Sequence, residues 1–109
     1  MAEPTLQEIF GSNATQDINT ITIRKSDLTG LTASASNTGE SLLVAILLKA
    51  KVNLTQTNFD SNIDQSIYIA TGFSSFASRG TDQTQYRTDQ LTVTLAKIDQ
   101  QSTFDPDDY

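Results

Sequence analysis

The segment from Glu40 to Thr57 limits what this chain can fold into more than any other, because it holds the longest apolar run, Leu42 to Leu48. As a β-strand, the segment is apolar at every even position from 42 to 54. Its odd positions change from apolar to polar after residue 47. A strand with this pattern is buried on both faces at its start and on one face at its end.

As an α-helix, the same segment would be capped by Asn37, with Glu40 three residues later as in a capping box. Its apolar face would hold Leu42, Leu43, Ile46, Leu47 and Ala50. The helix would also leave Val44, Leu48 and Val52 on the opposite side. Because the two-residue period is unbroken and the helical period is not, the sequence predicts a strand, and a helix over residues 40–49 is the alternative.

Alternating apolar and polar residues predict the other strands. These strands cover residues 20–25, with Ile21 and Ile23 on one face, residues 66–76, residues 86–98, and a weak edge strand over residues 28–35. Gly72, inside the second of them, predicts a bulge or a close approach of the backbone. The polar stretch 58–65 is predicted to be a loop. The expected fold is mainly β, an antiparallel five-stranded sandwich or half-barrel with a short N-terminal arm. The alternative is an α+β fold with a helix at 40–49.

The two ends of the chain differ from its middle. We expect an N-terminal arm over residues 1–17, a β domain over residues 18–98 and an acidic C-terminal tail over residues 99–109. A helix as short as the arm allows must dock its apolar side on something, either its own domain or a neighbouring subunit. The candidate subunit-contact residues are therefore the apolar side chains of these ends: Leu6, Ile9, Phe10, Phe104 and Tyr109.

The 109 residues include no histidine and no cysteine. The usual general base near neutral pH is missing, and nucleophile pairs with histidine, disulfides and thiolate metal sites are excluded. The seven basic residues are scattered and the net charge is −6, which disfavours nucleic acid and anionic membranes as partners. The N-terminus lacks the basic region of a signal peptide, and no apolar run is long enough to cross a bilayer. We expect a protein that is not an enzyme and that binds neither nucleic acid nor membrane.

One stretch resembles a metal site. Residues 60–64, Asp-Ser-Asn-Ile-Asp, follow the alternating oxygen ligands at the start of a calcium loop. Gln65 then stands where such a loop needs glycine, and Thr71 stands where it needs a bidentate glutamate. Turns between strands use the same residue types, so no metal and no cofactor is predicted.

Three aromatic side chains, Phe73, Phe76 and Tyr86, lie in or beside the predicted strands. We expect them to pack in the core, because no tryptophan and no cluster of basic residues accompanies them. The alternative is a stacking platform for a sugar or a base. The two interpretations differ in whether these rings are exposed together on one face.

A surface rich in Thr, Ser, Asn and Gln, a charged fraction of only 18% and the two extended ends resemble small β-rich structural proteins of tailed bacteriophage particles. Head-decoration, neck and tail components are examples. The resemblance implies a homo-oligomer that contacts other virion proteins, is assembled in the host cytoplasm and carries no cofactor. The hypothesis is therefore a structural virion protein that acts through protein–protein contacts. The alternative is a small ligand- or carbohydrate-binding β module that uses the three aromatics and loops such as 58–65.

Overall fold

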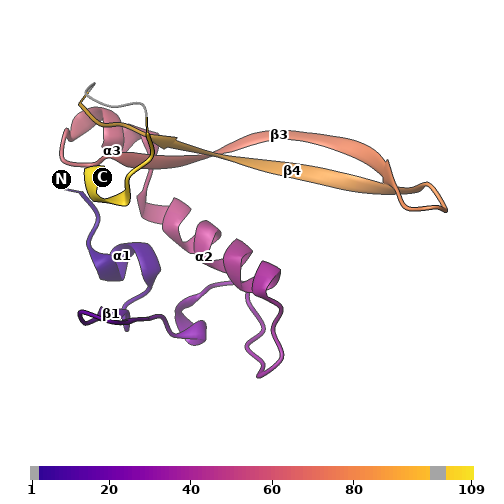
Figure 1. Ribbon diagram of the computed structural model, residues 1–109, viewed down its shortest axis with the longest axis horizontal. Helices are drawn as coiled ribbons and strands as arrows, with labels where there is room; N and C mark the ends of the chain where they lie inside the picture. Colours follow the sequence, from indigo (N-terminus) through magenta and orange to yellow (C-terminus); the bar gives the residue numbers. More distant parts are fainter. Residues whose placement is uncertain (1–2, 99–102) are drawn as a thin grey trace.

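The computed structural model describes residues 3–98 and 103–109 and has an α+β architecture (Figure 1). Its elements are α1 (Leu6–Phe10), β1 (Thr15–Gln16), β2 (Ile21–Thr22), α2 (Gly39–Asn53), α3 (Gln56–Ser61), β3 (Ile67–Arg79) and β4 (Thr84–Leu95), with short 3-10 turns at Lys25–Asp27 and Pro106–Asp108. In this part of the chain the strands form two separate antiparallel pairs, β1 with β2 and β3 with β4. The predicted five-stranded sandwich or half-barrel is therefore wrong.

The apolar segment that was predicted to be a strand forms helix α2 instead. The Thr38 hydroxyl accepts a hydrogen bond from the Ser41 backbone N–H at 3.1 Å and caps the helix, whereas Asn37 ties together the preceding loop. Leucine, alanine and lysine, which fill most of the segment, are strong helix formers. The alternative helix at 40–49 is the better prediction, although α2 continues to Asn53.

The β3–β4 hairpin confirms the two predicted strands around Gly72 and Leu91. Its register runs from Ile67 opposite Leu95 to Arg79 opposite Thr84, with a shift between Thr71 and Ser74. The shift confirms the predicted bulge at Gly72. A Cβ at residue 72 would lie 3.0 Å from the Gln90 Cβ, so the close approach of the strands favours glycine at this position.

Of the other predicted strands, one is shorter than expected and one does not form. The strand over residues 20–25 is reduced to β2, Ile21–Thr22, which pairs with β1 alone. Residues 28–35 form turns and irregular structure rather than an edge strand, and the predicted loop 58–65 contains most of α3. Within the residues that the structure describes, only β1 lies beside β2, and Ile21 is exposed.

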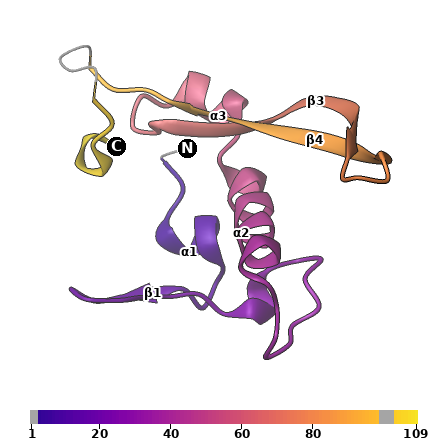
Figure 2. The ribbon, with the colours of Figure 1, turned by 45° about the vertical axis from the view of Figure 1, so that its right-hand side comes forward.

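The core is small and lies where α2 meets the base of the hairpin (Figure 2). Ala50 and Leu54 pack against Ile69, with Ile9, Ile67 and Leu91 around them. The Ile69 N–H donates to the Leu54 carbonyl oxygen at 3.0 Å, which ties β3 to the end of α2. Helix and hairpin diverge from this contact.

The N-terminal arm docks on its own chain. Thr5 and Glu8 form a capping box at the start of α1. Ile9 packs on the core, and the Asn53 side-chain amide donates to the Glu8 carbonyl oxygen at 2.8 Å. Of the two docking modes weighed for the arm, the chain itself therefore provides one.

Candidate assembly surface

The chain exposes far more surface than a compact protein of its mass. Its accessible surface is 8313 Å², whereas a compact monomer of 11.9 kDa is expected to expose about 6,000 Å². Its radius of gyration is 16.6 Å, against about 13 Å for a globular chain of this length. The excess of about 2,300 Å² is the area that a subunit buries in a large obligate interface.

Part of the excess is an apolar stripe on α2, made of Val44, Leu48 and Val52 and called the outer stripe below. The three side chains follow one another at four-residue intervals and so lie along one side of the helix. They are 52%, 46% and 65% exposed. A helix whose apolar residues extend beyond one face is normally covered on more than one side. The outer stripe is therefore a surface that another protein could cover.

The turn half of the β3–β4 hairpin is a second exposed feature. Both views show this half standing clear of the helices (Figures 1 and 2). Phe73 and Phe76 lie in it and are 84% and 65% exposed, so the prediction that they pack in the core is wrong. A two-stranded hairpin without further packing is only marginally stable in water, and this half gains stability if something covers it.

The exposed aromatics do not form one platform. Phe76 is paired with Arg87, and Tyr86 is paired with Ala77. Neighbouring residues of a strand point to opposite faces, so Phe76 and Tyr86 lie on opposite faces of the hairpin. The Arg79 guanidinium already lies over the Tyr86 ring, 5.2 Å from its centre.

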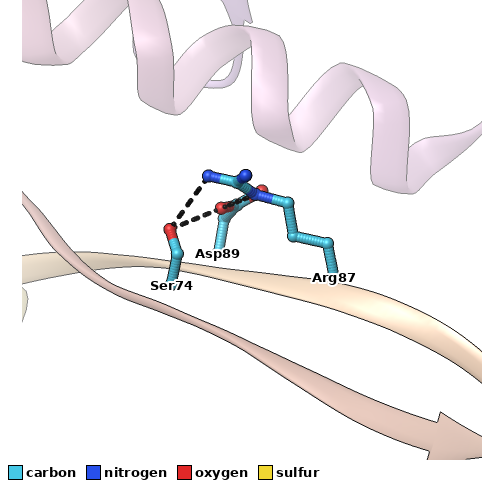
Figure 3. A network of polar contacts seen from close by, with 3 residues as sticks. All are labelled: Ser74, Arg87 and Asp89. Atoms are coloured by element: carbon cyan, nitrogen blue, oxygen red, sulfur yellow. Dashed lines mark hydrogen bonds and ion pairs between the residues drawn. The ribbon is translucent and has the colours of Figure 1, made fainter.

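A polar network crosses the exposed half of the hairpin (Figure 3). The Arg87 Nε donates to Asp89 Oδ1 at 2.9 Å, and the Ser74 hydroxyl donates to the same oxygen at 2.8 Å. The Arg87 Nη2 also reaches the Ser74 Oγ at 3.3 Å. The hydrogen bonds from Arg87 and then from Ser74 hold the pKa of Asp89 below its usual value. The network therefore presents one fixed cation and one fixed anion side by side.

The two outer edges of the hairpin differ. At the base of β3 the edge is occupied, since Leu54 accepts from Ile69 N–H and the Gln65 side-chain amide donates to the Ile67 carbonyl oxygen at 2.8 Å. In residues 3–98 and 103–109 no backbone hydrogen bond reaches the outer edge of β4. This strand carries neither proline nor lysine, the residues that usually protect such an edge.

A hollow of about 860 Å³ lies between α3, the end of β4 and the C-terminal segment. It is lined by Phe59, Asp60, Ser61, Ile63, Gln65, Ser66, Ala96, Lys97, Ile98 and Asp108. Its one cation, Lys97, is engaged, because its Nζ bonds the Thr103 carbonyl oxygen at 2.6 Å and Asp108 Oδ2 at 3.3 Å. Among the described residues no group of three acidic side chains is placed to hold a metal ion, the calcium-like stretch 60–64 included.

The predicted subunit-contact residues fall into two places. Leu6, Ile9 and Phe10 lie together on α1 and are partly covered by their own chain. Phe104 is exposed on the C-terminal segment, and the Tyr109 ring lies 5.9 Å from Lys97 Nζ. Residues 99–102 of the predicted acidic tail lie outside the described residues. The role of these five side chains in subunit contact stays a prediction.

The outer stripe and the β4 edge were missed at the level of sequence. A signal for the stripe was present, because Val44, Leu48 and Val52 are the residues that broke the helical pattern. Apolar residues that extend beyond one face of a helix have two interpretations. The segment is either a strand or a helix that is covered on a second face.

Comparisons of the chain with protein-family models, with curated proteins and with solved structures give no match. No helix within residues 3–98 and 103–109 is long and apolar enough to cross a membrane.

Proposed function

We propose that the chain is a structural subunit that acts through protein–protein contacts, with copies of itself and with other proteins of a tailed bacteriophage particle. In that particle it would be a capsid-decoration, neck or tail component. The observation that carries the proposal is the excess of exposed surface, about 2,300 Å² over a compact monomer of this mass, with the outer stripe of α2 as its apolar part. Contact area is the function that such a surface supports.

The small core supports the same conclusion. The buried apolar side chains in the described residues are Ala14, Leu28, Ala45, Ala50, Leu54 and Ile69, and half of them are alanines. Domains of about 100 residues are only marginally stable even with a well-filled core. Burial against other subunits would supply apolar contacts that the single chain lacks.

The features that suggest a phage particle are those of the sequence. The chain has no histidine or cysteine, few charges and a surface rich in Thr, Ser, Asn and Gln. The catalytic pairs that depend on histidine or cysteine are therefore absent. These features match a protein whose task is to fill and hold an interface, as the small structural proteins of tailed particles do.

One observation favours the alternative, a small ligand- or carbohydrate-binding module. The hollow beside α3 is lined by residues of the stretch 58–65, which a module of this kind would use to bind its ligand. The aromatics that such a module would use elsewhere lie on opposite faces of the hairpin. Titrating the protein with monosaccharides while following the amide signals of Phe59 and Lys97 by NMR tests this alternative, and saturable shifts at both would favour it.

The particle proposal is tested on tailed particles produced by the strain that encodes the chain. Gradient-purified particles are digested for peptide mass spectrometry and labelled with gold-coupled antibody to the chain. We expect its peptides at a fixed ratio to the major capsid protein and label at one position on the particle. Particles that lack both peptides and label would contradict the proposal.

A further inference from the structure

We propose that two copies of the chain pair antiparallel along the outer edges of β4, about a two-fold axis at Thr88, with Arg87 of each copy opposite Asp89 of the partner subunit. This inference rests on the proposed function and deepens it, because it names the occupant of one surface as a second copy. The paired hairpins form a continuous four-stranded sheet in the order β3, β4, β4, β3.

The first step is the direction of the backbone groups along β4. Ile69 uses its N–H outside the hairpin, on Leu54, so its backbone groups point away from β4. Its partner Val93 belongs to the same non-hydrogen-bonded pair and therefore also points outward. The bulge lies in β3, so the alternation along β4 is unbroken and places the outward groups at residues 91, 89, 87 and 85. These groups form the ladder that a second strand requires.

The second step is the register. In a two-fold antiparallel pair about residue 88, residue 87 lies opposite residue 89 of the partner subunit, and both carry outward backbone groups. Arg87 and Asp89 project on the same face of β4 and already form an ion pair within one copy, at 2.9 Å (Figure 3). Their spacing makes the edge self-complementary, as a two-fold interface must be. Moving the axis by one residue, to 87 or to 89, would place like charges directly opposite each other, which is destabilising.

The third step is the choice of edge. In a ring of copies, β4 would instead pair with β3 of the next subunit. The base of the β3 edge is already bonded to Leu54 and Gln65, so only its turn half is free. In that turn half, at the level of Arg87 and Asp89, β3 carries Ser74 and Phe76. Neither side chain is charged, so this part of the β3 edge has no charge to match those of β4. The β4 edge is free in the described chain and provides its own matching charges.

The pairing also explains how the exposed half of the hairpin stays ordered. A two-stranded ribbon gains independent stability when further strands join it. The second copy adds strands on the side where β4 is open. The Ser74–Arg87–Asp89 networks of the two copies then merge into one group with two cations and two anions.

Charge reversal with mixing tests the register. Arg87→Asp places four carboxylates at the axis, and Asp89→Arg places four guanidinium groups there. Each variant is expected to weaken self-association about tenfold or more, whereas an equimolar mixture of the two recovers it, because every facing pair is then opposite in charge. Self-association is measured by sedimentation equilibrium. If mixing gives no recovery, the two-fold pairing of β4 is wrong.

A cross-link tests the axis without changing a charge. The chain has no cysteine, so Thr88→Cys introduces a single thiol. Across a non-hydrogen-bonded pair the two Cα atoms lie about 4.5 Å apart, within the range that a disulfide spans. Mild oxidation with diamide is expected to link Thr88→Cys into a covalent dimer at protein concentrations where Thr92→Cys, on the same face of β4, stays unlinked. Equal linking of the two variants, or none of either, would overturn the register.

The outcomes separate this inference from the proposed function. If the wild-type chain forms an oligomer in sedimentation while mixing and cross-linking both fail, the β4 pairing is wrong and the assembly proposal stands. If the wild-type chain is a monomer at every concentration and Thr88→Cys does not cross-link, the β4 pairing is wrong and the assembly proposal loses its self-association. Recovery on mixing together with the cross-link at residue 88 supports the pairing.

Discussion

Replacing Val52 by threonine tests whether the outer stripe of α2 is covered in the assembled protein. The two side chains have nearly the same shape and similar helix propensity, so the substitution changes polarity with little effect on the helix. Val52 is 65% exposed in the single chain. Full burial of a valine is worth about 1.5–3 kcal/mol, so about two thirds of that, roughly 1–2 kcal/mol, is available only when a partner covers it.

Val52→Thr is therefore expected to weaken association by about fivefold to thirtyfold for each stripe that is covered. The unpaired threonine hydroxyl adds to this loss if it is buried without a hydrogen bond. The dissociation constant is measured by sedimentation equilibrium. The free energy of unfolding, measured by denaturant at a concentration where the chain is monomeric, should fall by only about 0.5–1 kcal/mol, since a third of the side chain is covered there.

Ile18→Thr is the matched control. It makes a comparable change at a residue that is 97% exposed in the β1–β2 turn, outside the outer stripe. Its association constant is expected to stay within twofold of the wild type. If Val52→Thr also leaves association unchanged while lowering monomer stability as expected, the stripe is not an interface and the reasoning from exposed area is refuted.

Three further changes test local features of the fold. Gly11→Ala should cost about 1–3 kcal/mol of unfolding free energy, because residue 11 has a φ of 120° and a Cβ there would lie 2.5 Å from the Asp27 Cβ; chemical denaturation with unchanged stability would contradict the tight approach. Gln65→Ala should cost about 2–4 kcal/mol, because its buried amide bonds two backbone carbonyl oxygens and a neighbouring side chain; a loss under 1 kcal/mol in thermal unfolding would speak against those bonds. Arg87→Met should raise the pKa of Asp89 towards its usual 3.8, since the Arg87 hydrogen bond is the main cause of its lowering. The stability that this ion pair contributes is present above that pH and lost below it, and an NMR titration showing the same Asp89 pKa in both proteins would disprove the link.

The hairpin could be predicted from the sequence because its signals are local. Leu91, Val93 and Leu95 alternate with threonines, and Gly72 interrupts the partner strand where the bulge occurs. The two strands follow each other in the chain and are separated only by residues 80–83, so each strand has its partner next to it in the sequence. The two-residue alternation of apolar and polar side chains predicts both strands, and the position of Gly72 predicts the bulge.

Helix α2 could not be predicted correctly, for a physical reason. Pattern analysis assumes that apolar side chains are buried by their own chain, so Val44, Leu48 and Val52 counted against a helix. In the structure these side chains are about half exposed or more, so the assumption does not hold for this helix. The cap on Thr38 was available in the sequence but was assigned one residue too early, to Asn37.

The candidate surface depended still more on three-dimensional structure. The edge of β4 is free because no further strand of the described chain pairs with it. The pattern of residues within β4 does not show whether a strand is at an edge. The relation between Arg87 and Asp89 is visible only once β4 is known to be an edge strand, and the role of Gln65 only once its amide is known to be buried.

The central claim, that this chain exists to make contact with other subunits, is tested most directly by its mass in solution. Light scattering of the purified chain over a wide range of concentration should give a discrete multiple of 11.9 kDa, an even multiple if β4 pairs as proposed, with a melting temperature that rises with concentration. A mass of 11.9 kDa at every concentration, with a melting temperature that does not change, would contradict the claim.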